Sequence, residues 1–272
     1  MPNWVENNFT ATGLTSEQQQ ELATNLQGNT FFANYIQAPD WENTPNEDGE
    51  LPVSETRTFA NGTTHTYSTF PTSGKQDDRW YDWNLTHFGC KWDIGGRDAD
   101  QASVVGSDEV SAFFLSPWSP PIVGLQAVSQ HYPEATFTFT YGEEGNDFAG
   151  VAVFRNGQCV ERSATTPSDF RHQWWEANHP DLFHQFIAAM NGEDEETDEW
   201  EVQEKLDELI YEEGGLDAYT DHLETLLNEA QAELEDDNIV CLSVSERVKL
   251  EEKAVADMHA SALKLAAALR SN

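Results

Sequence analysis

The residue types that most often bind metals or carry out catalysis are present in this sequence, but their spacing assigns them no role. No two of the eight histidines are four residues apart, the step that places two metal ligands on one helical face. Cys90, Cys159 and Cys241 form no Cys-x-x-Cys pair and are expected to be reduced thiols. There is no glycine-rich phosphate loop and no G-x-S-x-G elbow. We therefore expect no metal, no cofactor and no catalytic residue, and the sequence favours a protein that is not an enzyme.

Carboxylates are the abundant chemical group, with 49 Asp and Glu against 14 Lys and Arg and a net charge of −35. Residues 193–237 hold 20 acids and one base, Lys205, so these acids lack the basic neighbours that usually pair with them on helices. A field of this sign repels nucleic acid and anionic membranes and attracts basic proteins. We expect a basic host protein as partner and no direct nucleic-acid or membrane binding. The candidate partner-binding residues are Glu193, Asp194, Glu195, Glu196, Asp198, Glu199, Glu204, Asp207, Glu208, Glu212 and Glu213.

Five aromatic residues gather in the middle of the sequence and permit two interpretations. Aromatic side chains on a sheet can stack unpaired bases, but such platforms also need basic residues for the nucleic-acid backbone. Residues 1–160 contain 21 acids and 6 bases, which favours packing in the core. Lys91 is expected to pair with Asp93 or another acid rather than with a ligand. The five aromatic residues are Trp80, Tyr81, Trp83, Trp92 and Trp118.

The first part of the chain alternates strand and helix patterns, which predicts an α+β domain with a mainly antiparallel sheet and helices on one face. Residues 38–76 are rich in Pro, Asn, Thr, Gly and Asp and predict a long irregular insertion. The expected strands are 3–12, 30–37, 91–94, 110–115, 136–141, 148–155 and 158–162, and the expected helices are 15–26, 78–88 and 121–131.

The second part of the chain has helical periodicity, with expected helices at 169–177, 180–190, 201–213, 216–234 and 243–269. Their narrow apolar stripes predict a hairpin or small bundle, and the near-heptad spacing leaves homodimerisation through these helices open. We place the boundary between the α+β domain and the acidic helical region at residues 164 and 165.

Several short motifs in the first part together resemble a known family. They are Met1-Pro2-Asn3-Trp4, Trp80-Tyr81-x-Trp83, Gly89-Cys90-Lys91-Trp92-Asp93, Trp118-Ser119-Pro120-Pro121, Tyr132-Pro133 and Tyr141…Phe148-x-Gly150. In this order they resemble the YubB-like ferredoxin-like domain of phage and plasmid proteins, over about residues 1–160. Cys90 stands where that family would have Thr, and Ser116-Pro117 where it would have Thr-Ala. The resemblance implies a ferredoxin-like fold, a mobile-element origin and no defined activity. It makes a structural role the expectation for Trp80, Tyr81, Trp83, Lys91, Trp92, Asp93, Trp118 and Ser119.

Charge and resemblance together give one leading hypothesis and two alternatives. The leading hypothesis is an accessory protein of a phage or plasmid that binds a basic host protein through its acidic helices, as a DNA mimic or anti-defence factor. One alternative is an acidic protein adapted to high salt, without a charge-specific partner. The other is an enzyme with a site between the sheet and the 38–76 insertion. The sequence has neither a long apolar run nor a signal-peptide pattern, so we expect the protein in the host cytoplasm.

Overall fold

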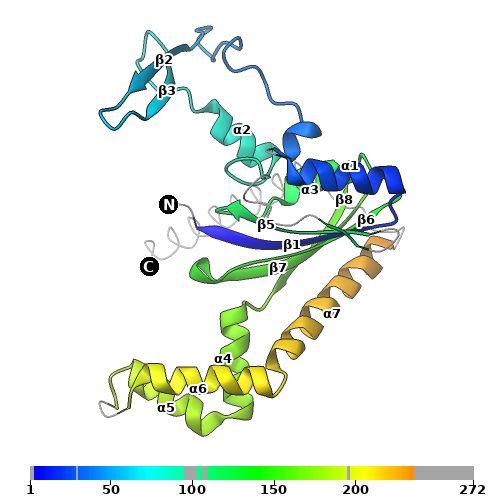
Figure 1. Cartoon of the computed structure of the whole chain (residues 1–272), viewed down its shortest axis with the longest axis vertical. Coiled ribbons are helices and arrows are strands. Elements are labelled where there is room, and N and C mark those ends of the chain that lie inside the picture. The colour runs from blue at the N-terminus through cyan, green and yellow to red at the C-terminus, as the bar shows by residue number, and fades with distance from the viewer. Residues whose placement is uncertain (1–2, 29, 95–102, 106–108, 195–196, 236–272) are drawn as a thin grey trace, which may run out of the picture.

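The computed structural model describes residues 3–28, 30–94, 103–105, 109–194 and 197–235. Its centre is a six-stranded sheet in which every neighbouring pair is antiparallel, in the order β4-β5-β1-β6-β7-β8 (Figure 1). The strands are β1 Trp4–Thr12, β4 Ser103–Val105, β5 Glu109–Pro117, β6 Thr136–Glu143, β7 Phe148–Arg155 and β8 Gln158–Ala164. The helices are α1 Ser16–Gln27, α2 Arg79–His87, α3 Ile122–Ser129, α4 Pro167–Asn178, α5 Pro180–Met190, α6 Glu199–Glu212 and α7 Gly215–Glu235. These elements confirm the predicted α+β class with a mainly antiparallel sheet.

Helices α1 and α3 cover one face of the sheet and enclose the main core. Strand β1 lies in the middle and alternates exposed and buried residues, so that Phe9 and Ala11 point into this core. Phe9 meets Phe137 of β6 edge to face, with ring centroids 5.1 Å apart. Helix α1 begins at a capping box, in which the Thr15 side chain accepts a hydrogen bond from the Gln18 amide. The predicted strand, helix and core pattern is thus confirmed for this part of the chain.

The acidic helical region divides into two structural parts. Helices α4, α5 and α6 enclose a small core of their own, in which the indole nitrogen of Trp175 donates to the Leu206 carbonyl at 3.0 Å. Helix α7 leaves this bundle and runs to the sheet (Figure 1). Its residue Ala230 is fully buried against Val153 and Val160, on the face of the sheet opposite to α1 and α3. The helix predicted at 243–269 lies outside the described residues.

Two of the strands predicted from sequence are wrong. Residues 30–37 contain a 3-10 turn, η1 (Phe32–Asn34), instead of a strand, because the Asp93 carboxylate accepts the backbone N–H groups at its start. Residues 91–94 form no strand. A second 3-10 turn, η3 (Glu144–Asn146), connects β6 to β7.

The insertion at 38–76 is more ordered than predicted, because it contains the antiparallel hairpin β2 (Val53–Thr58) and β3 (Thr64–Thr69). Arg79 at the start of α2 holds the insertion in place through contacts with three of its residues. Its guanidinium lies 5.1 Å from the ring centroids of Trp41 and Phe70 and donates to the Thr44 carbonyl at 2.9 Å. It also forms a two-bond pair with Asp77.

Candidate functional site

The residues of the family resemblance occupy two different environments. Asp93 is structural, since its carboxylate accepts the backbone N–H groups of Phe31, Phe32 and Ala33 at 3.0, 2.7 and 2.9 Å. Burial raises the pKa of Asp93, and these hydrogen bonds only partly oppose the rise. Lys91 does not pair with Asp93 as expected from the sequence. Its ammonium group lies 5.1 Å from the ring centroid of Trp92 and 5.9 Å from that of Tyr81.

Trp118 has the most unusual backbone of these residues, with a φ of 73° and a side chain that is 45% exposed. A positive φ is strained for a bulky residue, so neighbouring contacts must hold it. Ser119 donates to the Gly89 carbonyl at 2.6 Å, and Ser116 donates to the Ser119 carbonyl at 2.8 Å. The fully buried Asn7 in turn donates to the Ser116 hydroxyl at 3.0 Å. This network fixes a loop that presents an indole to solvent.

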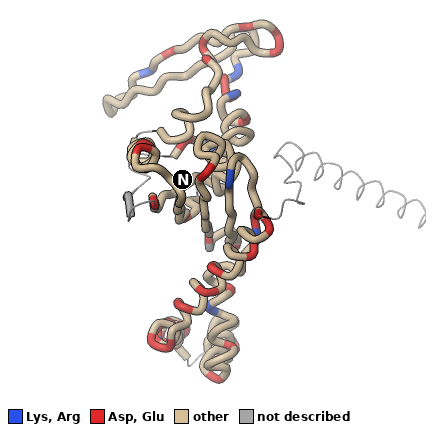
Figure 2. Tube along the Cα trace, turned by 90° about the vertical axis from the view of Figure 1, so that its right-hand side faces the viewer, with Lys and Arg blue, Asp and Glu red and all other residues tan. Residues whose placement is uncertain are grey.

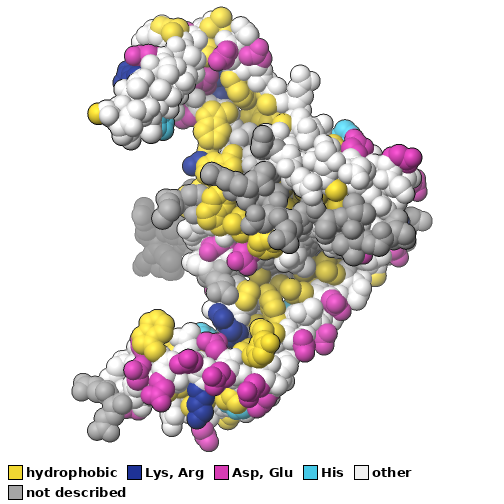
Figure 3. Space-filling view, in the orientation of Figure 1, with side chains coloured by type: hydrophobic (Ala, Val, Ile, Leu, Met, Phe, Trp, Pro, Cys, Tyr) yellow, Lys and Arg dark blue, Asp and Glu magenta, His cyan; other side chains and the backbone are white. Residues whose placement is uncertain are grey.

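Of the five aromatic residues predicted to pack in the core, Trp83 alone packs against it, and none of the five is fully buried. Trp80, Tyr81 and Trp118 are exposed, and Trp83 and Trp92 are half-buried. Trp92 meets Trp4 edge to face at 6.0 Å, so part of the group forms a surface beside β1. Hydrophobic side chains gather in the hollow between the β2–β3 hairpin and the sheet (Figure 3). The sequence failed here because aromatic content does not say which side of an element faces the core.

The acidic candidates of the helical region do not share one setting. Glu193 and Asp194 follow α5, Asp198 caps the first amides of α6, and Glu213 contacts His179 at 3.1 Å. Glu195 and Glu196 lie outside the described residues. The remaining candidates, Glu199, Glu204, Asp207, Glu208 and Glu212, are on α6 itself. Acidic residues extend along the described helices α4 to α7, with few bases among them (Figure 2).

One side of α6 combines these acids with two aromatic side chains that the sequence prediction missed. Trp200 is 72% exposed and Tyr211 is 76% exposed, at the two ends of a shallow groove of about 660 Å³. We call this groove the Trp200–Tyr211 surface; its residues are Trp200, Gln203, Glu204, Asp207, Glu208 and Tyr211. The sequence did contain a signal for this surface, because Trp200 and Tyr211 lie outside the apolar stripe that Val202, Leu206 and Ile210 form on the helix.

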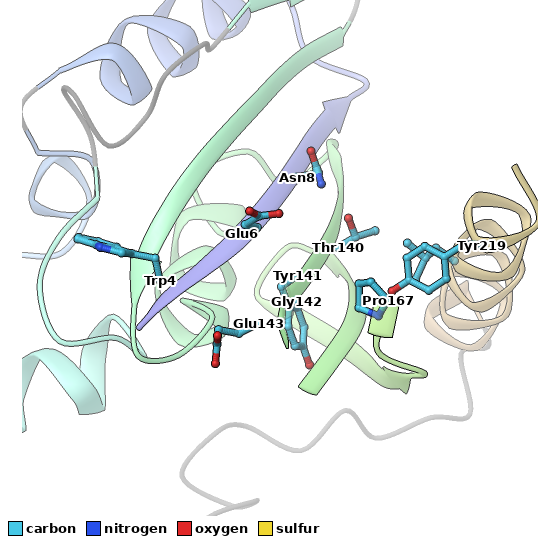
Figure 4. Close-up of a pocket in the computed structure, with 10 residues that line it drawn as sticks. Trp4, Glu6, Asn8, Thr140, Tyr141, Gly142, Glu143, Pro167 and Tyr219 are labelled. Carbon is cyan, nitrogen blue, oxygen red and sulfur yellow. The ribbon is translucent and has the colours of Figure 1, made fainter. Parts of the chain in front are cut away.

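A second cavity lies between the sheet and α7, with a volume of about 420 Å³ (Figure 4). We call it the sheet–α7 pocket; its residues are Trp4, Glu6, Asn8, Thr140, Tyr141, Gly142, Glu143, Pro167, Tyr219 and Leu223. Glu6, Asn8 and Thr140 belong to adjacent positions of β1 and β6, since Asn8 pairs with Thr140 and Glu6 with Gly142. Figure 4 shows Trp4 at one end of this group and Tyr219 of α7 at the other.

Sequence analysis did not identify this pocket because its residues come from four elements. The polar alternation of β1 and β6 was a signal, but it is also the ordinary pattern of a sheet face in solvent. Tyr219 lies in the helix expected at 216–234, and its hydroxyl donates to the Thr165 carbonyl at 3.1 Å. Among the residues that the structure describes, no group of three or more His, Cys, Asp or Glu is placed to hold a metal ion.

Comparisons with known proteins support the fold class and give no activity or partner. Residues 91–217 match the model of a family described as a ferredoxin-like domain in Api92-like protein. The match supports the predicted ferredoxin-like α+β class, and it runs across the predicted boundary at 164 and 165 into α7. The chain is also similar to the crystal structure of a protein api92 from Yersinia pseudotuberculosis, with 12% identity and a TM-score of 0.35. That similarity covers 61% of this chain and 98% of the other. No curated protein matches the chain.

Within the described part of the chain, no helix is both long enough and apolar enough to cross a membrane.

Proposed function

We propose that this chain binds a basic protein through the Trp200–Tyr211 surface of α6. The observation that carries the proposal is the pair of largely exposed aromatic side chains flanking Glu204, Asp207 and Glu208. Trp and Tyr are enriched among the residues that dominate protein interfaces. Removing about 150 Å² of one such side chain from water is worth about 4 kcal/mol before the costs of binding are subtracted.

The direction of the acids on α6 supports a basic partner. At about 100° per residue, five of the six acids of this helix fall within an arc of about 140°. These five are Glu201, Glu204, Asp207, Glu208 and Glu212. Lys205 is the one base of the helix. An Arg-rich or Lys-rich surface would therefore meet carboxylates along the whole groove.

A more specific form of the proposal is that α6 imitates nucleic acid. The helix has 14 residues and is about 21 Å long, so its six acids give one charge per about 3.5 Å. One strand of DNA carries a charge every 3.4 Å or so. The partner would then be a nucleic-acid-binding or defence protein. The resemblance to the YubB-like domain adds the proposed setting, a phage or plasmid protein acting in the host cytoplasm.

Fluorescence anisotropy with a labelled amphipathic peptide rich in Arg and Lys would test the proposal. The variant Glu204→Gln/Asp207→Asn/Glu208→Gln is expected to bind about tenfold more weakly than the unmodified chain. The matched control, Glu42→Gln/Glu47→Gln/Asp48→Asn, removes the same charge from exposed positions of the insertion and should change affinity less than about twofold. Circular dichroism would verify the fold of both variants.

Two results would contradict the proposal. Equal losses in both variants would mean that attraction depends on total charge, as expected for an acidic protein adapted to high salt. Unchanged affinity in both would remove α6 as the binding surface.

The alternative of an enzyme site beside the insertion would instead be supported by turnover of a substrate that is lost when the insertion is displaced. Sedimentation velocity would determine whether the C-terminal helices form a homodimer.

A further inference from the structure

Strand β2 of the insertion has a hydrogen-bonded neighbour on one edge only, because β2 and β3 form a two-stranded sheet of their own. All six residues of β2 are exposed. The hairpin projects from the molecule at the end opposite to helices α4, α5 and α6 (Figure 1). A two-stranded hairpin alone is marginally stable in water, and an unpaired strand edge is a template for another strand. The outer edge of β2 is therefore open to a further strand.

The alternation of the strand determines which backbone groups lie on this open edge. The Phe59 N–H donates to the Thr63 carbonyl at 2.8 Å, so Phe59 points toward β3. Successive residues of a strand direct their N–H and C=O groups to opposite edges, so those of Ser54, Thr56 and Thr58 point outward. In the part of the chain that the structure describes, no other backbone group pairs with these three. A partner strand would satisfy them.

The hairpin is electrically neutral, although the chain as a whole is strongly acidic. Residues 53–69 contain one acid, Glu55, and one base, Arg57, whereas the net charge of the chain is −35. These two side chains pair at 3.1 Å on one face of the hairpin. Repulsion between acidic helices at the far ends of two molecules is screened beyond about 8 Å in physiological salt. Charge therefore favours the hairpin over the acidic helices as the place where two copies meet.

A second copy of β2 is complementary to this edge in one register. If two copies pair antiparallel with Thr56 on the two-fold axis, Glu55 of each copy lies opposite Arg57 of the other. The outward backbone groups of Ser54 then meet those of Thr58, and the Thr56 groups of the two copies meet each other. Moving the axis to Glu55 or to Arg57 would put like charges opposite each other, which destabilises a strand pair. Charge and backbone geometry thus select the same register.

The uncharged side chains of the hairpin fit this register as well. On the face opposite to Glu55, the Thr56 and Thr66 hydroxyls contact each other at 2.9 Å. With Thr56 on the axis, this row of hydroxyls continues into the second copy, and such pairs between strands are stabilising. The same register places Val53 opposite Phe59 of the second copy, and both of these apolar side chains are exposed in the single chain. Their contact would remove apolar surface from water.

We propose that the chain forms a two-fold symmetric dimer in which β2 pairs antiparallel with β2 of a second copy. The two hairpins then make one four-stranded sheet, and the same surface of each copy is used twice. Two short strand edges bury little area, so the dissociation constant is expected to be micromolar or weaker. The edge of β2 shares no residue with the Trp200–Tyr211 surface, so the dimer stands or fails separately from the proposed function.

Sedimentation equilibrium of the full chain in physiological salt, up to millimolar concentration, would test the proposal. Thr56→Pro removes an outward N–H group and should weaken dimerisation at least about tenfold. The matched control is Thr66→Pro, which breaks the same pair of hydroxyls but places proline at the other edge of the hairpin, and it should stay within about twofold. A chain that is monomeric at every concentration overturns the proposal. Dimerisation that Thr56→Pro leaves unchanged, or that Thr66→Pro weakens equally, also overturns it.

Charge reversal tests the register without relying on proline. Glu55→Arg and Arg57→Glu should each weaken dimerisation about tenfold, because each puts like charges opposite each other at two symmetry-related positions. An equimolar mixture of the two variants should dimerise again, because each charge then meets its opposite. Stronger dimerisation of Glu55→Arg alone would show that only the total charge matters and would overturn the proposal. A mixture that associates as weakly as the separate variants would overturn it too.

Discussion

Replacing Asp93 with alanine should lower the free energy of unfolding by about 2 kcal/mol, whereas asparagine should lower it by less than about 1 kcal/mol. Alanine removes the acceptor for three backbone N–H groups, but these do not contribute equally. The Phe31 amide also donates to the Ile94 carbonyl at 2.8 Å, and Ala33 is exposed to water. The buried Phe32 amide is therefore the group left without a partner. Asparagine keeps the Oδ1 atom that accepts from Phe31 and Phe32.

Urea unfolding followed by near-UV circular dichroism would measure these differences, with an unchanged m-value as the condition for comparing them. Asparagine as destabilising as alanine would show that the charge of Asp93 matters more than its acceptors. An alanine variant within about 0.5 kcal/mol of the unmodified chain would show that the N–H contacts do not stabilise η1.

The pH dependence gives an independent measurement on the same residue. Burial raises the pKa of Asp93 in the folded chain, so the folded state binds this proton more tightly than the unfolded state does. The contribution of Asp93 to unfolding free energy must then fall as pH rises from about 4, its unfolded value, through its folded pKa. Asp93→Asn removes this contribution, so the variant should gain stability relative to the unmodified chain over that interval. A relative loss over the same interval would contradict the raised pKa.

Three further substitutions test how the elements are joined. Arg79→Ala should release the insertion, making its amides exchange hydrogen faster, whereas Arg79→Lys should retain part of the pairing with Asp77. Gly150→Ala should cost about 2 kcal/mol, because an added Cβ would meet the Tyr141 hydroxyl oxygen at 2.3 Å, and thermal unfolding would measure the loss. Ala230→Asp would bury an unpaired carboxylate and should detach α7, which limited proteolysis would detect as new cleavage within that helix while the sheet stays protected.

Local signals in the sequence were sufficient for most helices and for the hairpins of the sheet. The hairpin between β7 and β8 turns at Asn156 and Gly157, whose φ values of 47° and 76° are those that the Asn-Gly pair favours. Helix α5 begins and ends at the predicted residues, Pro180 and Met190. These features depend on neighbours within a few residues, so a single sequence contains the information.

The errors arose where partners distant in sequence decide the structure. The segment at 30–37 has the composition of a strand, but Asp93, about 60 residues away, accepts its amides and favours a 3-10 turn. Trp118 was expected inside, yet the hydroxyls of Ser116 and Ser119 hold its loop so that the indole is exposed. Periodicity cannot report contacts of this kind, because neither partner has a local signature.

Two of the described cations join elements of the fold, which bears on the Trp200–Tyr211 surface. Arg79 fastens the insertion, and Arg162 of β8 pairs with Glu233 of α7. Lys205 is the one base within α6, so most acids of this helix have no cation of their own helix to pair with, and acids one helical turn apart are about 6 Å from each other. That separation is shorter than the screening length of about 8 Å at physiological ionic strength, so their mutual repulsion persists there. A basic surface that contacts several of these acids at once relieves it, and its affinity should fall steeply with added salt.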